Sequence, residues 1–251
     1  MTAPLDHRKS GGILPDSKIR ATPAPINPDS IASLRQINDL SSTVSDVLDH
    51  LGVISCVGAS ILRPTIVGKT VVGRAITVRN VPQKRSSYLN AEEDLSLMNE
   101  LEGINQSSPG DVLVIQGVPN VSNMGGMVAT IAKHHGLVGA VVDGGVRDVG
   151  RSRANDFPVW SRDISPITGK YRCVTEEVNG TINVCGVTVN AGDLVVADET
   201  GVCFVPQQYI NDVLAACRKI DDVEKEWLQD CERGLSIPDI MKKVYKQLRD
   251  K

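Results

Sequence analysis

Two short segments of the sequence combine glycines with groups that can bind an anion or a metal ion. The first is Asp-Gly-Gly-Val-Arg-Asp at residues 143–148. The guanidinium group of Arg147 can bind a carboxylate or an enolate in a fixed fork geometry. Asp148 offers a hard oxygen ligand for Mg²⁺, which typically takes one or two protein carboxylates and keeps its waters. A local Arg147–Asp148 ion pair that caps the following helix is the alternative explanation.

The second segment is Asn-Met-Gly-Gly-Met at residues 123–127. Glycines allow a tight turn in which several N–H groups converge, and unpaired N–H groups at a helix N-terminus attract a carboxylate or phosphate. The alternative is a glycine turn that serves only close packing. The spacing matches neither the G-x-x-x-x-G-K-[ST] phosphate loop nor the G-x-G-x-x-G dinucleotide loop, which disfavours a nucleotide ligand.

The residues around these segments predict a strand–helix–strand unit that positions both of them. Residues 112–115 and 138–142 are apolar runs typical of buried strands, and residues 127–135 have helical periodicity that ends before Gly136. This order implies two parallel strands joined by a right-handed crossover. Ligands of such sheets bind at the carboxyl ends of the strands, where residues 143–148 begin.

Periodicity, turn residues and capping residues predict the remaining elements. They are helices from 28, over 42–51, over 209–232 and from 236, and strands over 71–79, 182–189, 194–197 and 202–205. The pattern predicts a mixed α/β fold with one parallel unit and a second, hairpin-rich sheet. We expect residues 28–251 to form a single domain with C-terminal helices. Residues 1–27 are rich in proline and predict an extended arm that is disordered or wraps a neighbouring subunit.

The composition is that of an ordinary globular protein and excludes several classes of function. Hydrophobic residues make up 41% of the chain and aromatic residues 3%, so the core is built mainly from Val, Ile, Leu and Ala. The net charge of −3 gives no reason to expect a nucleic-acid partner. No apolar run reaches the roughly 20 residues of a membrane helix, and residues 1–28 lack the apolar core of a signal peptide. We therefore expect a cytoplasmic protein whose six cysteines are reduced, buried thiols, and a zinc site or disulfides are the alternative.

Three parts of the sequence, in this order and spacing, resemble the RraA-like family. Residues 42–52 resemble its opening helix, residues 125–160 its central signature, and residues 192–206 its closing hairpin. The resemblance implies a three-layer β/β/α fold of the swivelling-domain type, assembled as trimers or hexamers with sites between subunits. It also implies a class II pyruvate aldolase, which cleaves 4-hydroxy-4-methyl-2-oxoglutarate or 4-carboxy-4-hydroxy-2-oxoadipate and also decarboxylates oxaloacetate. Other members of the family bind and inhibit a ribonuclease.

The resemblance also assigns roles to individual residues. Asp148 resembles the aspartate that holds the metal ion, Mg²⁺ or Mn²⁺, and Arg147 resembles the arginine that stabilises the pyruvate enolate. Glu224 resembles a glutamate supplied by a neighbouring subunit, and this carboxylate or a bridging water would act as general base. The substrate carboxylate would be bound by three backbone N–H groups, those of Gly125, Gly126 and Met127.

The sequence departs from the aldolase pattern at two positions. Gly126 stands where the aldolases have an aspartate, 21 positions before the arginine, and Gln116 stands where the strand usually ends in an aspartate. Three hypotheses follow: a divalent-metal-dependent lyase of this kind, a related lyase for a different hydroxylated 2-oxo acid, and a non-enzymatic regulator that binds a ribonuclease. Retention of Arg147 and Asp148 favours the lyases, which would act on a small 2-oxo acid as homo-oligomers.

Overall fold

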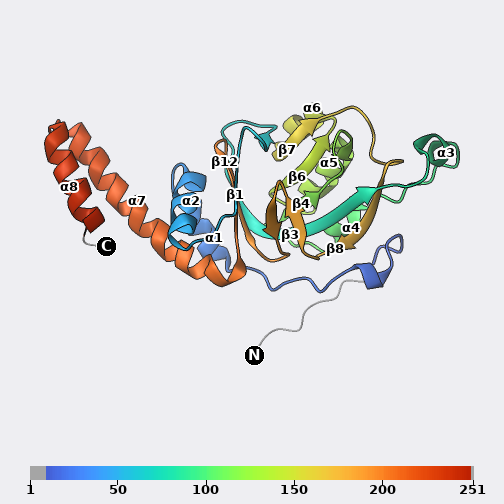
Figure 1. The fold of residues 1–251 in the computed structure, drawn as a ribbon, viewed down its shortest axis with the longest axis horizontal. Helices are drawn as coiled ribbons and strands as arrows, with labels where there is room; N and C mark the ends of the chain where they lie inside the picture. Colours follow the sequence, from blue (N-terminus) through green and yellow to red (C-terminus); the bar gives the residue numbers. More distant parts are fainter. Residues whose placement is uncertain (1–9, 250–251) are drawn as a thin grey trace.

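The computed structural model describes residues 10–249, with side chains from residue 10 to residue 243. Its centre is a ten-stranded mixed sheet in the order β1, β12, β11, β3, β4, β6, β7, β2, with β5 beside β6 and β8 beside β3 (Figure 1). A second sheet consists of β9 and β10. The strands are β1 (Cys56–Gly58), β2 (Arg63–Pro64), β3 (Val71–Pro82), β4 (Val112–Gln116), β5 (Ser122–Met124), β6 (Gly139–Val146), β7 (Val159–Ile164), β8 (Cys173–Val178), β9 (Ile182–Val184), β10 (Val187–Val189), β11 (Leu194–Ala197) and β12 (Gly201–Val205).

Eight α-helices and two 3-10 turns are described between residues 10 and 249. They are α1 (Pro28–Leu34), α2 (Leu40–His50), α3 (Ser87–Glu92), α4 (Glu100–Asn105), α5 (Gly126–His134), α6 (Val149–Ala154), α7 (Ile210–Glu232) and α8 (Ile237–Arg249), with η1 (Asp16–Lys18) and η2 (Gln207–Tyr209). In this part of the chain, no helix combines the length and the apolar character that crossing a membrane requires.

The predicted strand–helix–strand unit is present as β4, α5 and β6. The two strands are parallel, with Val112 opposite Gly139 and Gln116 opposite Asp143. Strands β3 and β7 extend the parallel set on either side. Strand β6 continues to Val146, four residues beyond its predicted end at residue 142, so Arg147 follows the strand directly.

Alternate residues of the central strands face two different apolar cores, and this alternation produces three layers. On one face, Leu113 packs in a core with Ala129 of α5. On the other face, Val114 packs in a core with Ile182 of the β9–β10 hairpin and Phe204 of β12. This arrangement confirms the β/β/α fold expected from the resemblance.

Strand β3 is long enough to join both halves of the curled main sheet. Its first residues, 71–74, pair with β11, and its last residues, 78–82, pair with β8. The hairpins predicted over 182–189 and 194–205 both form, but they belong to different sheets. Strands β11 and β12 extend the main sheet, whereas β9 and β10 alone make the second one.

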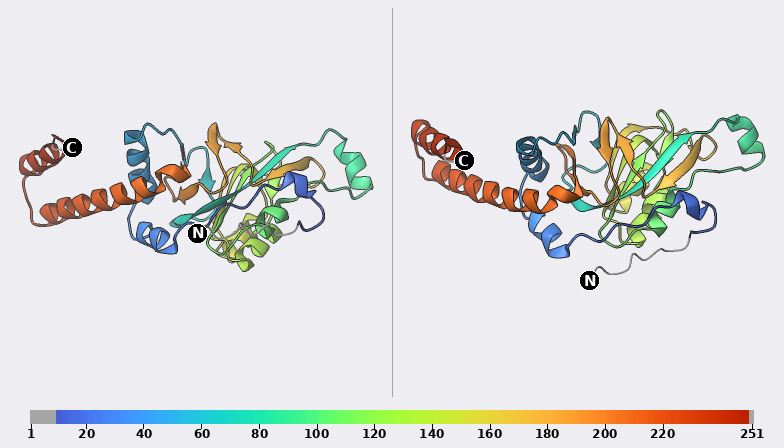
Figure 2. Two further views of the ribbon diagram at one scale, coloured as in Figure 1. Left: turned by 90° about the horizontal axis from the view of Figure 1, so that it is seen from below. Right: turned by 60° about the horizontal axis from the view of Figure 1, so that its bottom comes forward.

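Helices α1, α2 and α7 cover the outer face of β11 and β12. Leu48 of α2 and Val213 of α7 are buried in one core with Val196 and Val205 of these strands. Beyond this contact α7 projects away from the sheets, and α8 folds back along it (Figures 1 and 2). The C-terminal helices predicted from periodicity therefore form, and much of α7 lies outside the body of the protein.

Residues 10–27 of the predicted arm lie extended along the domain of their own chain (Figure 2). Leu14 is buried in the core beside α5, and Ile19 pairs with Val178 of β8. Arg20 Nε lies 2.7 Å from Glu177 Oε1. The described part of the arm therefore packs against its own sheet, unlike the two arrangements expected from composition. Residues 1–9 lie outside the described residues.

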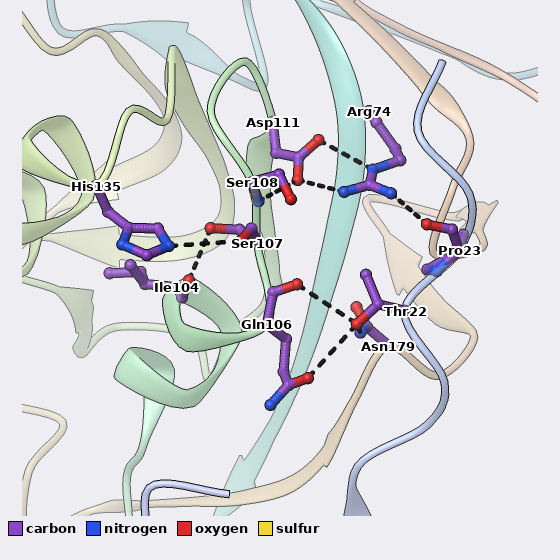
Figure 3. A network of polar contacts seen from close by, with 10 residues as sticks. All are labelled: Thr22, Pro23, Arg74, Ile104, Gln106, Ser107, Ser108, Asp111, His135 and Asn179. Carbon is purple, nitrogen blue, oxygen red and sulfur yellow. Dashed lines mark hydrogen bonds and ion pairs between the residues drawn. The ribbon is translucent and has the colours of Figure 1, made fainter. Parts of the chain in front are cut away.

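A buried ion pair connects this arm to the sheet (Figure 3). Arg74 of β3 donates to Asp111 through Nε and Nη2 at 2.9 and 2.6 Å, and it also donates to the carbonyl oxygen of Pro23. The Thr22 hydroxyl lies 3.4 Å from the backbone and side-chain oxygens of Gln106. Only 3% of the Arg74 side chain and 7% of the Asp111 side chain are exposed. The aspartate of the turn before β4 therefore has a structural role.

Replacing Arg74 with alanine should lower the free energy of unfolding by about 3–5 kcal/mol, because the Asp111 carboxylate would stay buried without its partner. Urea unfolding followed by circular dichroism measures this loss. The matched control is Arg20→Ala, which removes an ion pair of the same arm whose arginine is 65% exposed. That change should cost less than about 1 kcal/mol, and equal losses in the two variants would contradict the assignment.

Candidate functional site

A cavity of about 240 Å³ lies where β5 and β6 end and α5 begins. Its wall includes four residues that the sequence singled out: Gly125, Met127, Arg147 and Asp148. The fold thus brings the two glycine-containing segments together at one site. The cavity also contains two charged residues that the sequence reasoning missed, Glu100 and Lys170.

The adjacent ends of β5 and β6 position Arg147. The two strands are parallel, with Met124 opposite Val146, and the Arg147 N–H donates to the Met124 carbonyl at 3.1 Å. Arg147 therefore lies directly beside the turn at Gly125. Its side chain is 42% exposed, so a ligand in the cavity can reach the guanidinium group.

Asp148 turns the chain from β6 into α6, while its carboxylate reaches back to α5. Its φ of 56° lies in the left-handed region, which aspartate adopts more readily than most residues. Oδ2 accepts the Gly126 N–H at 3.1 Å and lies 3.5 Å from Arg147 Nε. The Arg–Asp ion pair considered from the sequence therefore forms, but its aspartate caps α5 and not the following helix.

Glycine at position 126 permits the close approach of α5 to α6. A Cβ atom on Gly126 would lie 2.8 Å from Asp148 Cβ and 2.9 Å from Arg151 Cβ, closer than van der Waals contact allows. The aspartate that the aldolases have at this position therefore does not fit the present arrangement. The Gly126 N–H, which the resemblance assigns to substrate binding, donates to Asp148 in this structure.

Glu100 is the first residue of α4 and is only 6% exposed. Burial raises the pKa of its carboxyl group from 4.5 to about 7, and the positive charge of Arg147 partly offsets that rise. Near neutral pH the carboxyl group therefore exists in both protonated and ionised forms, which suits a general acid or base. No motif or periodicity around Glu100 marks it in the sequence, because α4 has only six residues.

Two other residues of the sequence analysis lie away from the cavity. The exposed Glu224 lies on α7, which packs against α1 and α2. Its role at a site needs a second chain and stays a prediction. The side-chain oxygen of Gln116 accepts a hydrogen bond from the Asn183 N–H at 2.9 Å. The glutamine that replaces the expected aspartate therefore connects the β9–β10 hairpin to the main sheet.

The donor groups of the cavity suit Mg²⁺ or Mn²⁺. Among the side chains described, those of residues 10–243, no three His, Cys, Asp or Glu gather into a complete metal-binding cluster. Mg²⁺ does not need one, because it binds through one or two carboxylates and completes its shell with water and substrate. The Asp148 side chain is 52% exposed, and its described polar contacts use Oδ2. Oδ1 is therefore available as a ligand.

The family model described as RraA-like (Aldolase/RraA) matches residues 41–204 of the chain. The protein belongs to the RraA-like family. A relative from Halalkalibacterium halodurans, named "Putative 4-hydroxy-4-methyl-2-oxoglutarate aldolase", is 31% identical over 74% of this chain and 82% of its own length. Protein DlpA of Legionella pneumophila is 28% identical over 75% of this chain, which spans only 30% of DlpA.

Solved structures share the fold of this RraA-like protein. RraAS2 of Streptomyces coelicolor, described as an unusual member of the RNase ES inhibitor RraA protein family, has a TM-score of 0.68 and 27% identity. The match covers 80% of this chain and 96% of RraAS2. An uncharacterized protein from Pseudomonas syringae has a TM-score of 0.73 at 24% identity, over 87% of this chain and 100% of its own.

Adding one methyl group at position 126 tests the contact on which the site depends. Gly126→Ala should lower the free energy of unfolding by about 1–3 kcal/mol, because the new Cβ overlaps Asp148 and Arg151. Gly125→Ala is the matched control, since its Cβ would meet only atoms of the exposed Arg147 and Asp148 side chains, the nearest at 3.2 Å. Urea unfolding of both variants measures this difference in the free energy of unfolding. Equal stability of the two variants would contradict the close packing of Gly126 against Asp148 and Arg151.

Proposed function

We propose that this RraA-like protein is a divalent-metal-dependent lyase that cleaves a C–C bond of a small 2-oxo acid through a pyruvate enolate. The observation that carries this proposal is the meeting of Arg147, Asp148 and the N-terminus of α5 in one cavity. We take the substrate to be 4-hydroxy-4-methyl-2-oxoglutarate or a related hydroxylated 2-oxo acid, with oxaloacetate decarboxylation as a companion activity. The name of the 31% identical relative supports this choice.

The N-terminus of α5 would bind the substrate carboxylate. The first N–H groups of a helix have no carbonyl partner within that helix, and they attract anions. Since Gly126 donates to Asp148, the N–H groups of Gly125 and Met127 remain for the substrate. These contacts would direct the 2-oxo group of the substrate toward Arg147.

Arg147 would stabilise the charge that develops when the bond breaks. Cleavage leaves an enolate, and a fixed guanidinium group beside its oxygen lowers the energy of that charge in a confined site. Asp148 would hold Mg²⁺ or Mn²⁺, and the bound metal would supply Lewis acidity at the 2-oxo group. Asp148 and the first turn of α5 would also keep the substrate in one orientation.

Glu100 would move the proton in this reaction. Its ionised carboxylate would accept the proton of the 4-hydroxyl group as the bond between C3 and C4 breaks. The carboxylic acid would then return that proton to C3 of the enolate and give pyruvate. Decarboxylation of oxaloacetate leaves the same enolate and needs only the second of these transfers, so one carboxyl group serves both activities.

We also propose a homo-oligomer, a trimer or a hexamer, in which Glu224 completes the cavity of a neighbouring subunit. Helix α7, which carries Glu224, projects away from the sheets (Figure 1). Its exposed Glu224 is therefore accessible to a second copy of the chain.

Asp148→Ala should abolish Mg²⁺-stimulated release of pyruvate, because it removes the carboxylate that would hold the metal. The variant should stay folded, since losing one cap and one exposed ion pair lowers the free energy of unfolding by no more than about 2 kcal/mol. A coupled pyruvate assay and urea unfolding measure the two quantities. Asp163→Ala is the control, because Asp163 is exposed on β7 outside the cavity. Full activity of Asp148→Ala would refute the metal role.

The kcat/KM for a hydroxylated 2-oxo acid should rise with pH around a midpoint near 7, as Glu100 ionises. Glu100→Gln should lower kcat/KM by about 10²- to 10⁴-fold and abolish this rise. The pH dependence of the free energy of unfolding provides an independent check on the pKa of Glu100. Since folding raises the pKa of Glu100, the native state binds the proton more tightly, and stability should fall as pH increases from 4.5 to about 7.

Glu100→Gln should lack this particular loss of stability, which urea unfolding at pH 5 and pH 8 would show. The comparison also establishes that the variant is folded before its activity is interpreted. A variant that retains the wild-type pH–rate profile would remove Glu100 from the mechanism, whatever its stability.

A further inference from the structure

Two cysteines outside the candidate site lie opposite each other in the main sheet. Cys56 begins β1 and Cys203 is the third residue of β12, and the antiparallel register makes them direct partners. Both contribute to the core between the sheet and helices α2 and α7. Direct cross-strand partners project to the same face of a sheet, so the two thiols are neighbours.

The hydrogen-bond pattern of these strands gives the pair a geometry that suits a disulfide. The Phe204 N–H donates to the Ser55 carbonyl at 2.9 Å. Hydrogen-bonded and non-hydrogen-bonded pairs alternate along an antiparallel ladder, so Cys56 and Cys203 form a non-hydrogen-bonded pair. The Cα atoms of such pairs lie about 4.5 Å apart, and disulfides span about 4.4–6.8 Å. The bond can therefore form without separating the strands.

A second cavity gives small molecules access to this pair. Its volume is about 320 Å³, and its wall contains both cysteines together with Ser42, Ser45 and Asp46 of α2. Cys56 is partly exposed, whereas Cys203 is only 2% exposed. A small neutral oxidant entering the cavity therefore meets Cys56 first.

The surroundings of the two thiols give them different chemistry. Hydrogen bonds from Cys203 and Ser45 lower the pKa of Cys56 from 9.0 to about 7, against the opposing effects of burial and of Asp49. The same contact raises the pKa of Cys203, and its burial adds to the rise. Burial also raises the thiol pKa of three further cysteines, Cys173, Cys185 and Cys217.

We propose that Cys56 and Cys203 form a peroxide-sensitive dithiol, with Cys56 as the attacking cysteine and Cys203 as the resolving cysteine. This modification site is separate from the lyase cavity and does not rest on the proposed function. It takes a small hydroperoxide such as hydrogen peroxide, which enters through the cavity beside α2.

The reaction balances with one peroxide for each pair of thiols. The Cys56 thiolate attacks one peroxide oxygen, the O–O bond breaks, and the leaving hydroxide takes up the proton that Cys56 released. The Cys203 thiol then attacks the sulfenic acid on Cys56 and expels a second water. The two sulfurs together lose two electrons, which reduce the peroxide to two water molecules. A thiol reductant reverses the bond by disulfide exchange.

The test is peroxide titration of the reduced full-length chain, followed by alkylation, digestion and mass spectrometry without reductant. We expect a peptide pair in which Cys56 is joined to Cys203, formed at about one peroxide per chain and lost again with dithiothreitol. We also expect iodoacetamide to modify Cys56 with a pH midpoint near 7. Absence of the peptide pair after the exposed Cys231 has been oxidised would overturn the proposal.

Two variants distinguish a disulfide between Cys56 and Cys203 from nonspecific oxidation of the cysteines. Cys203→Ser should leave Cys56 at the sulfenic acid, where dimedone traps it. Cys217→Ser is the matched control, because Cys217 is buried in the same core but is not a cross-strand partner, and this variant should still form the bond. A wild-type disulfide that joins Cys56 to any other cysteine would also overturn the proposal. The wild-type result stands even if a variant fails to fold.

Discussion

The close approach of α5 to the turn after β6 is the constraint on which the candidate site depends. The Gly126 N–H donates to Asp148 across this contact, and the space at Gly126 admits no side chain. Because β5 pairs with β6 just before the turn, the helix N-terminus and Arg147 come from neighbouring strands. The N–H groups at the N-terminus of α5, a guanidinium group and a carboxylate therefore converge where two paired strands end, and sites built on helices and strands hold their geometry better than sites on loops.

Much of this arrangement is predictable from the sequence, because it follows from local patterns. Apolar runs bounded by turn residues identified β4 and β6, and helical periodicity identified α5 between them. Since parallel strands bind ligands at their carboxyl ends, the position of Arg147 and Asp148 followed from the order of these elements. The resemblance to the RraA-like family, confirmed over residues 41–204, supplied the three-layer fold that periodicity alone does not specify.

The features that the sequence did not reveal depend on contacts between distant residues. Strand β5 has only three residues, two of them polar, and exists because it pairs with β6. Glu100 resembles any surface glutamate until the fold buries it beside Arg147. The arm composition suggested solvent or a neighbouring chain, whereas the Arg74–Asp111 pair holds Pro23 on its own domain. The Asp148 carboxylate accepts a hydrogen bond from the first residue of the preceding helix, α5, and makes none to the following helix, which residue spacing could not show.

The proposed lyase is tested most directly by pyruvate release by the wild-type protein from 4-hydroxy-4-methyl-2-oxoglutarate and from oxaloacetate, first with Mg²⁺ and then with excess EDTA. We expect metal-dependent pyruvate from oxaloacetate, since its decarboxylation needs only the enolate-stabilising groups and the transfer of one proton from Glu100 to C3. Release from the hydroxylated acid as well would show that glycine at position 126 is compatible with the aldol cleavage. No metal-dependent pyruvate from either compound would contradict a pyruvate-enolate lyase at Arg147 and Asp148.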